Sequence, residues 1–525
     1  MDTESPSDSS ERFKLYDELE LQEFHDKFVI KSHQSPNEGF WISRIDGNIN
    51  LLDGDTVSES PTKTSTIYGV VGTIRLVVGT YAIVITSRKE VGSFLGFPVY
   101  RLTSMRVLAC NEALRFSTSQ EKRDEAYFLT LLKVVESMPG LYYSYEGDIS
   151  LNLQRRSKLV EGWMSKPLWK QADPRYVWNK HLMEELIELK PDMYYLNRDL
   201  RFQTAELKLK DSCAKLTLIS RRCTRRLGTR MWRRGANFEG DTANFIETEQ
   251  LLELEEFKFS FLQVRGSIPI LWEQIVDLSY KPHLRVINHE QTSNIVERHF
   301  HDLSQRYGEV LAVDLTDKQH GEEGQLSAAY AAEMQNQQNV RKGDILEEQK
   351  GIMRSNCIDS LDRTNVTQCY MAQKALNLQL QRMGVLTSSE CISMFDEEYG
   401  KFRILWAEQG DEISLEYAGT NALKGDFDAL DLISGHYTVS RNIPSPFQRN
   451  GCEALSKTVT VQYLPVASAL IIGGLTATTF TLQQGRNAQQ YVSSVLYAGL
   501  TAGVMAIVKA NGRQFCSRPR LCGLL

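Results

Sequence analysis

The sequence lacks the features that mark several special classes of protein. Its nine cysteines include no Cys-x-x-Cys pair and no regular spacing, so neither a disulfide framework nor a zinc ribbon is expected, and a reducing compartment is favoured. It has no basic surplus, since the formal net charge is −6, which argues against a general nucleic-acid binder. No internal repeat or long low-complexity tract is present. The start of the chain has neither the basic region nor the apolar run of a signal peptide.

What remains is the composition of a large globular protein. The chain has 525 residues, of which 42% are hydrophobic and 24% charged, enough for two or three domains with substantial cores. We expect residues 1–15 to form a disordered acidic tail. Residues 16–177 contain β-branched runs near Phe40 and over 66–88, which predict a β-rich domain, with one helix over 121–135 stopped at 138–140.

The next region, 178–439, mixes strand-like segments at 215–220 and 257–264 with helical ones and is read as an α/β domain. The Pro, Ser and Asn content of 440–460 is typical of a linker.

The end of the chain carries two long apolar runs, 461–482 and 487–508, neither of which contains a charged residue. A span needs about 20 residues, so both could cross a bilayer, and their small residues would let the two helices pack closely. The alternative is a pair of buried helices in a soluble core. Lys457 before the first run and the basic residues of 509–525 after the second predict that both flanks, and hence the main body, face the cytosol.

One stretch, 220–235, concentrates positive charge without a single acid. It is followed at once by an acidic series over 239–253. One interpretation is a solvated face neutralised by those acids. The other is recognition of an anionic lipid head group or membrane surface, since arginine forks match phosphate geometry. The basic residues are Arg221, Arg222, Arg225, Arg226, Arg230, Arg233 and Arg234.

A second stretch, RSNCIDSLDRTN over 354–365, places Cys357 six positions before Arg363. A strand-like segment precedes it, and a helix that ends at Gly384 follows, with Thr364 or Asn365 able to cap its first turn. A loop between a strand and a helix N-terminus offers unpaired N–H groups and the helix dipole to an anion.

That setting assigns a task to each polar residue of the loop. A cysteine at such a position can ionise and act as a nucleophile, and Arg363 can fork onto phosphate oxygens. Asp359 or Asp362 could protonate the leaving oxygen and then activate water, and Thr364 could hydrogen-bond the departing thiolate. No metal or other cofactor is needed. The plainer interpretation is that Cys357 is a small buried hydrophobe and that the aspartates cap the loop.

At this point the sequence resembles a known family, the Sac-domain phosphoinositide phosphatases. The loop resembles their Cys-x5-Arg-Thr signature, and the likeness extends to DPRYVWNKHL (173–182), TRMWRRGANFEGDTANFIETEQ (229–250) and FLQVRGSIPILWEQ (261–274). The resemblance implies an α/β protein in which a β-rich N-terminal Sac domain packs on an α/β catalytic domain, followed by a two-helix transmembrane hairpin. It implies Cys357 as nucleophile and Arg363 as phosphate binder, with the general acid left between Asp359 and Asp362, the former slightly favoured. The candidate substrate-binding residues are Asn356, Ser360, Arg230, Arg234 and Arg265.

Within the family, the sequence looks most like the membrane-anchored type that hydrolyses phosphatidylinositol 4-phosphate at the endoplasmic reticulum and Golgi. Two departures stand out. Ser360 replaces a second cysteine common in the loop. At Phe427–Asp428 the chain lacks an intervening segment that includes a Tyr-Tyr-x-Asn-Asn-Phe run, as if shortened internally.

The leading hypothesis is a membrane-tethered phosphatase acting on an inositol lipid. Two others stay open. One is a phosphoprotein phosphatase with the same loop, and the other is an anchored phosphoinositide-binding protein that holds the anion without turnover.

Overall fold

The computed structural model describes most of the chain. The described residues are 14–35, 38–52, 60–136, 141–160, 162–189, 201–230, 233–274, 283–317, 321–335, 349–422, 464–483 and 488–510. Five features expected from the sequence lie wholly or largely outside them: the acidic tail, the helix stop at 138–140, the linker at 440–460, the junction at 427–428 and the basic tail.

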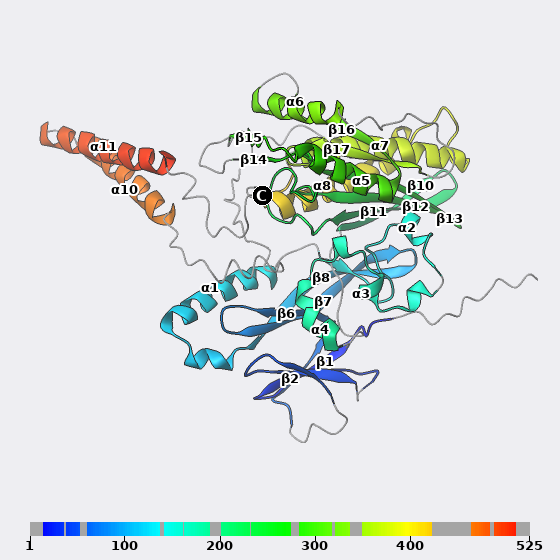
Figure 1. The fold of residues 1–525 in the computed structure, drawn as a ribbon, viewed down its shortest axis with the longest axis horizontal. Helices are drawn as coiled ribbons and strands as arrows, with labels where there is room; N and C mark the ends of the chain where they lie inside the picture. The colour runs from blue at the N-terminus through cyan, green and yellow to red at the C-terminus, as the bar shows by residue number, and fades with distance from the viewer. Residues whose placement is uncertain are drawn as a thin grey trace, which may run out of the picture.

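Two antiparallel sheets form the N-terminal part of the body, at the bottom of Figure 1. The first has the order β4-β3-β2-β1-β5 and the second β6-β7-β8-β9. Apolar side chains of both sheets are buried, as the β-branched runs predicted. Their strands are β1 (Leu19–Glu23), β2 (Lys27–Ser32), β3 (Gly39–Ser43), β4 (Ile49–Leu51), β5 (Lys63–Ile67), β6 (Val70–Arg75), β7 (Thr80–Phe94), β8 (Phe97–Cys110) and β9 (Tyr142–Tyr143).

One long helix, α1 (Ser119–Glu136), follows β8 after the single turn η1 (Glu112–Phe116), which confirms the helix predicted over 121–135. Short helical turns then carry the chain to the second half of the body. They are α2 (Leu153–Arg156), η2 (Trp163–Ser165), α3 (Leu168–Gln171), η3 (Pro174–Tyr176), η4 (His181–Met183) and α4 (Glu184–Leu189).

A 6-stranded mixed sheet organises the second half, with the order β10-β11-β12-β13-β17-β16. The first four strands are antiparallel neighbours, whereas β17 pairs parallel with both β13 and β16. The strands are β10 (Arg201–Leu209), β11 (Ser212–Arg222), β12 (Ile246–Leu254), β13 (Phe257–Ser267), β16 (Glu309–Asp314) and β17 (Gly351–Cys357); a small pair, β14 (Trp272–Gln274) and β15 (Leu284–Val286), follows β13.

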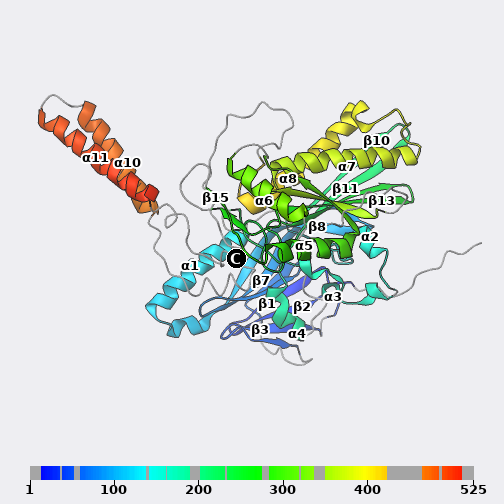
Figure 2. The ribbon, with the colours of Figure 1, turned by 45° about the horizontal axis from the view of Figure 1, so that its top comes forward.

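Helices cover both faces of this sheet (Figures 1 and 2). The apolar faces of α7 (Asp362–Arg382) and α8 (Asp396–Ala418), with η5 (Ile392–Met394), pack on β10 to β12 around Trp406. On the other face, α5 (Thr292–Tyr307) packs on β13, β16 and β17, and α6 (Gly321–Gln335) lies against β14 and β15. Parallel strands buried between helices make this an α/β arrangement.

Two apolar helices end the described chain, α10 (Leu464–Gln483) and α11 (Ala488–Ala510), and they lie side by side (Figure 1). Gly474 has no room for a side chain, because a Cβ there would lie 2.1 Å from Thr501 Oγ1, so a small residue does let these helices approach. Within the described residues, α11 contains one segment long and apolar enough to cross a membrane, Tyr491–Val508, and α10 a shorter apolar stretch, Ala469–Gln483.

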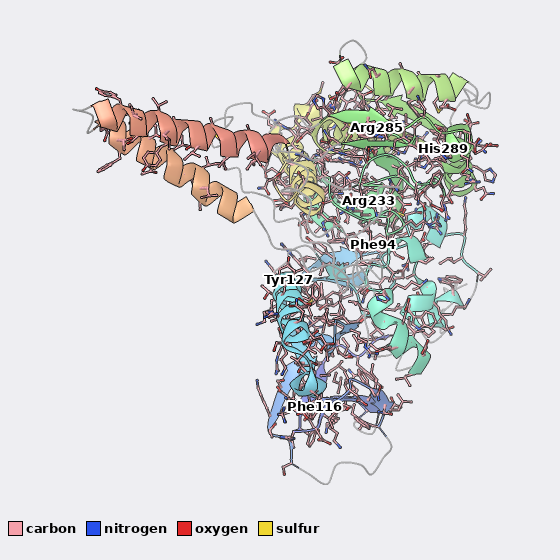
Figure 3. The ribbon with its side chains drawn as sticks, turned by 60° about the vertical axis from the view of Figure 1, so that its left-hand side comes forward. Phe94, Phe116, Tyr127, Arg233, Arg285 and His289 are labelled. Carbon is pink, nitrogen blue, oxygen red and sulfur yellow. The ribbon has the colours of Figure 1, made fainter. Side chains whose placement is uncertain are left out.

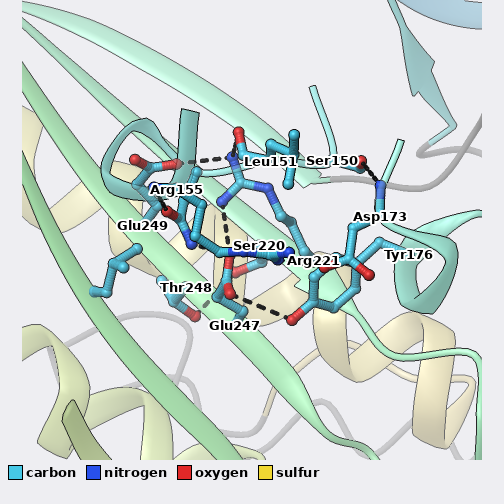
Figure 4. Close-up of polar contacts among 12 residues, drawn as sticks. Ser150, Leu151, Arg155, Asp173, Tyr176, Ser220, Arg221, Glu247, Thr248 and Glu249 are labelled. Carbon is cyan, nitrogen blue, oxygen red and sulfur yellow. Dashed lines mark hydrogen bonds and ion pairs between the residues drawn. The ribbon is translucent and has the colours of Figure 1, made fainter. Parts of the chain in front are cut away.

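The arginine-rich stretch begins inside the protein, which makes both surface interpretations wrong for its first members. Arg221 is fully buried, with Nη1 3.1 Å from Glu247 Oε1 and Nη2 2.7 Å from Glu249 Oε2 (Figure 4). Arg222, also buried, pairs with Glu416 of α8 at 2.9 Å. The physical reason is register: Arg221 lies directly opposite Glu247 on the antiparallel strands β11 and β12. Glu247 and Glu249 of the acidic series do neutralise Arg221, but they do so inside the protein, between neighbouring strands, and not on a solvated face.

The same charges join the two halves of the body. Arg221 donates to the carbonyl oxygens of Ile149 and Leu151, and Asn152 donates to Glu247 at 3.1 Å. All of these groups are buried, so each depends on the others for the hydrogen bonds that water would otherwise supply. The connection between the halves is therefore ionic and specific rather than only apolar.

Arg221→Ala is expected to lower the free energy of unfolding by about 3–5 kcal/mol, because it leaves two carboxylates buried without their partner. The control is Arg225→Ala in the same stretch. The Arg225 side chain is 40% exposed and lies 3.4 Å from Asp241, and its loss is expected to cost less than about 1 kcal/mol. Unfolding of the full chain in denaturant measures both variants; equal losses would contradict the assignment.

Candidate phosphate-binding loop

The stretch singled out by its cysteine and arginine forms the turn between β17 and α7. β17 ends at Cys357 and α7 begins at Asp362, as the predicted strand and helix required. The turn lies at the carboxyl ends of the parallel strands β13 and β17, where Ile268 N donates to Cys357 O at 3.1 Å. Ligands of open α/β sheets bind at such an edge.

Free N–H groups surround this turn. Within the described residues, the backbone N–H groups of Ile358, Asp359 and Ser360 make no hydrogen bond to other groups of the chain. The cap position of α7 is Leu361, and no side chain caps the helix there. The expected cap by Thr364 or Asn365 is therefore wrong, because both lie inside the helix. An uncapped helix N-terminus beside free loop amides is suited to bind an oxyanion.

Cys357 is fully buried at the base of the turn, with its Sγ 4.0 Å from Asp359 Oδ1. Burial lowers the pKa of Arg363, but the electrostatic influence of the Cys357 position and the hydrogen-bonded Glu323 outweigh burial and raise that pKa above its ordinary value. The sulfur, a carboxylate and a guanidinium thus act on one another within one turn. Cys357, Asp359 and Arg363, which the sequence analysis singled out, lie in or directly after this turn, and their catalytic roles stay a prediction.

Arg265, on β13, holds the turn from below. Its Nη2 donates to the carbonyl oxygens of Ser360 (2.6 Å) and Leu361 (2.8 Å), its Nε to Ser360 Oγ (3.2 Å) and its Nη1 to Asn365 Oδ1 (3.2 Å). Ser360 adopts φ +57°, which a non-glycine residue rarely does and which costs of order 1 kcal/mol or more. Every guanidinium nitrogen of Arg265 is engaged with the loop, so its observed role is to fix the shape of the turn.

Three further side chains hold the other carbonyl groups of the turn. Arg234 Nη1 and Ser267 Oγ donate to Ile358 O at 3.3 and 3.2 Å, and Asn244 Nδ2 donates to Asp359 O at 3.1 Å. The carbonyl oxygens of the turn are thus all bound by side chains of the body. The free N–H groups of the turn remain available to an anion. Arg234 also donates to Gln274 of β14, which connects the loop to that strand.

Arg354, three residues before Cys357 on β17, is buried and donates to neutral acceptors: His299 Nε2, Thr242 Oγ1 and the carbonyl oxygens of Gly266, Ser267 and Ser355. Burial lowers the pKa of Arg354 to about 10, so it keeps its charge at neutral pH. Burial and the neighbouring Arg354 lower the pKa of His299 to about 3, so its ring stays neutral, with Nδ1–H donating to Gly240 O at 2.8 Å. A positive charge is thereby fixed close to the loop.

The guanidinium of Arg363 is held by a carboxylate from another element. Glu323, in the first turn of α6, accepts from Arg363 Nη1 at 3.0 Å and from the backbone N–H of Asp317 at 3.1 Å. Both side chains of the pair are partly exposed, so an incoming anion could displace the carboxylate.

Several buried polar atoms around the loop have no hydrogen-bond partner in the described part of the chain. They include Thr364 Oγ1, Asn356 Oδ1 and Ser355 Oγ, all in residues that are fully buried. Such atoms are rare in native proteins and gather where a ligand or a reaction completes them. Asn356 also donates to Tyr330 OH at 3.2 Å, which fixes its amide.

Of the sequence-predicted substrate-binding residues, Ser360 and Asn356 lie in or beside the loop, and Arg234 and Arg265 contact its backbone. Arg230 is exposed, its backbone N–H donates to Tyr417 O, and no contact joins its side chain to the loop among the described residues. Sequence reasoning missed Glu323, Asn244, Ser267, Arg354 and His299. Arg354, Asn244 and Ser267 fell inside motifs already singled out, so only their roles were missing, whereas nothing in the sequence pointed to Glu323.

The comparisons with known proteins agree with one another. A family model described as the SacI homology domain matches residues 68–355. The chain is 57% identical to phosphoinositide phosphatase SAC8 of Arabidopsis thaliana, over 98% of this chain and 99% of that protein, and 39% identical to phosphoinositide phosphatase SAC7 of the same plant, over 97% and 98%. It is 27% identical to phosphatidylinositol-3-phosphatase SAC1-A of Danio rerio, over 96% and 98%.

The comparisons also bear on the length of the chain. The alignment with the first of these relatives runs over 591 positions against the 525 residues of this chain, so at least 66 positions have no counterpart here. This agrees with the internal shortening expected from the sequence. The junction expected at 427–428 lies outside the described residues.

Arg265→Lys is expected to weaken binding of a phosphate mimic such as tungstate by tenfold or more, because a lysine cannot reach Ser360, Leu361 and Asn365 at once. Calorimetric titration of the folded full chain measures it. The control is Arg285→Lys, at an exposed arginine 3.7 Å from Glu273, which should bind tungstate like the wild type. Undiminished affinity in Arg265→Lys would remove Arg265 from its role.

Glu323→Gln is expected to tighten tungstate binding roughly twofold to fivefold, since a partly exposed ion pair is worth about 0.2–1 kcal/mol and no longer competes for Arg363. Glu322→Gln is the matched control: this neighbour contacts His283 and Leu284 N instead. Weaker binding in Glu323→Gln would mean that the carboxylate positions Arg363 for the anion rather than competing with it.

Proposed function

The chain belongs to the SacI homology domain family of phosphoinositide phosphatases, and from this premise we propose that it removes the monoester phosphate of phosphatidylinositol phosphates through a phosphocysteine at Cys357. The preferred substrate in this proposal is phosphatidylinositol 4-phosphate. The observation that carries it is the turn at Cys357, where free loop amides, an uncapped helix N-terminus and Arg363 surround one buried sulfur.

In the first step, the substrate phosphate displaces Glu323 from Arg363, and the loop N–H groups bind its oxygens. Cys357 Sγ, as the thiolate, attacks phosphorus while the bond from phosphorus to the inositol oxygen breaks. Asp359 gives its proton to that oxygen, so the inositol lipid leaves as an alcohol. Asp359 is preferred over Asp362 because its Oδ1 lies 4.0 Å from the sulfur; Asp362 is the second candidate.

In the second step, the same carboxylate takes a proton from water, whose oxygen attacks phosphorus as the sulfur–phosphorus bond breaks. Inorganic phosphate and the thiolate result. The hydroxyl of Thr364, buried and without a partner within the described residues, can donate to the departing sulfur. The buried charges of Arg265 and Arg354 stabilise the anion from beneath without touching it.

The membrane location is part of the same proposal. We take α10 and α11 as a transmembrane hairpin with both ends in the cytosol, in the endoplasmic reticulum or Golgi membrane. Support comes from the apolar segment of α11, the apolar stretch of α10 and the basic residues that flank both helices. A lipid substrate suits a tethered catalytic domain better than a phosphoprotein does.

A second candidate function has one observation in its favour. The chain lacks at least 66 positions that align in a close relative. If the missing segment supports catalysis, this chain would bind phosphoinositides without turnover.

The test is phosphate release by the purified full chain from vesicles containing each phosphatidylinositol monophosphate in turn. Separate positional isomers are needed because the name of the Danio rerio relative specifies the 3-phosphate. Cys357→Ser is expected to lower kcat by roughly 10³-fold or more while keeping lipid binding. Cys391→Ser, at a partly exposed free cysteine outside the loop, is the control and should keep full activity.

Three outcomes would redirect the proposal. Retained turnover in Cys357→Ser would exclude the phosphocysteine, and loss of wild-type activity on adding a chelator would point to a metal-dependent reaction. Binding of wild type to phosphoinositide vesicles without any release would favour the second candidate. A phosphopeptide hydrolysed faster than every lipid would exclude the lipid substrate.

A further inference from the structure

The turn before α1 carries the most exposed large apolar side chain in the described residues. Phe116, the last residue of η1, is 93% exposed. Its neighbour Arg115 is also exposed. Single exposed apolar residues are common on protein surfaces, so Phe116 alone indicates nothing. What distinguishes it is the helix that follows.

The outward face of α1 carries three basic residues and one aromatic residue, and the partly exposed acids of the helix, Glu121 and Asp124, hydrogen-bond to Thr118 and Gln120. Lys122, Arg123, Tyr127 and Lys133 are exposed, whereas Phe128 and Leu132 of the same helix are buried in the body. These exposed positions recur at helical spacing and so share one side of the helix. Within the described residues, no ion pair involves Arg115 or the three basic residues of α1. With Phe116 they form what we call the α1 face.

This face is rigidly mounted. Glu125, on the buried side of α1, accepts from the backbone N–H groups of Val77, Val78 and Gly79, each at 3.0 Å, and from Tyr81 OH at 2.7 Å. Four hydrogen bonds to one buried carboxylate fix the helix on the turn between β6 and β7. The position of the α1 face relative to the sheet of β6 and β7 is therefore fixed.

The face also lies on the same side of the molecule as the phosphate-binding loop. Arg234 connects that loop to β14, which pairs with β15. Figures 1 and 2 both show β15 and α1 on the left and α2 on the right. Figure 3, turned so that this left side comes forward, shows Phe116 of η1 and Tyr127 of α1 below Arg233 and Arg285.

We propose that the α1 face docks on an anionic lipid bilayer, with Phe116 inserted among the head groups and the basic side chains against the lipid phosphates. Unpaired cations beside exposed aromatic residues on a helix face are the chemistry of membrane-surface binding. The chain also carries, in α11, a segment long and apolar enough to cross a bilayer, which would keep the α1 face near a membrane. Docking at α1 would hold the loop toward the membrane. The membrane location and this consequence rest on the proposed function, whereas the docking does not depend on the proposed reaction.

The direct test uses Phe116→Trp in the full chain, reconstituted into vesicles of phosphatidylcholine with one-fifth phosphatidylserine and acyl chains brominated near the head group. The emission added by the new tryptophan, over that of the seven native ones, should be largely quenched. The matched control is Val160→Trp, at a residue that is 71% exposed and follows α2, the helix that Figures 1 and 2 show on the side opposite α1. Equal quenching at the two positions would overturn the proposal and leave the face to a protein partner.

A kinetic test adds a functional readout. Arg123→Glu should raise the apparent KM for phosphoinositide in the same vesicles roughly fivefold or more, as expected for removing one basic residue from an anionic surface. The kcat/KM on a soluble short-chain phosphoinositide should not change. Lys208→Glu, at an exposed lysine of β10 away from α1, should alter neither value. Because quenching needs no turnover, the docking can be decided even if the proposed reaction fails, and an unchanged KM in Arg123→Glu would count against it.

Discussion

The guanidinium of Arg265 contacts the carbonyl oxygens of Ser360 and Leu361, the hydroxyl of Ser360 and the amide oxygen of Asn365. That one group keeps Ser360 in a left-handed conformation and keeps the carbonyl groups away from the place where an anion would bind. The free amides, the uncapped helix and the buried sulfur matter only while the turn has this shape. Arg265 can hold it because β13 and β17 run parallel and end together.

A second set of buried charges performs a similar task at the connection between the two halves of the body. Arg221 contacts Glu247 and Glu249 on β12 and two carbonyl groups of the segment at 149–151. Buried ion pairs often add little to stability, but they disfavour every other arrangement of the groups involved. Buried, specific hydrogen bonds thus join the N-terminal half of the body to the sheet that carries the loop.

Sequence reasoning predicted the elements that local pattern determines. The strand ending at Cys357, the helix following it and the strands of both halves were expected from alternation, glycine and helical spacing. It misplaced the helix cap, because capping depends on backbone angles that Thr364 and Asn365 do not reveal. It placed the arginine-rich stretch on the surface, because only strand register shows Arg221 opposite Glu247. Glu323 was missed since its contact with Arg363 joins elements 40 residues apart.

The burial of Arg265 and Arg354 has a consequence for how this protein responds to ionic strength. Mobile ions screen charges that water reaches, over about 8 Å at physiological salt, but they scarcely weaken charges enclosed by protein. The cations beneath the loop are enclosed, whereas those on α1 are in contact with solvent. A rise in salt concentration would therefore weaken binding of the α1 face to a charged surface. It would weaken the electrostatic attraction between the buried cations and a bound phosphate much less. The two forms of anion recognition are therefore separable by salt alone.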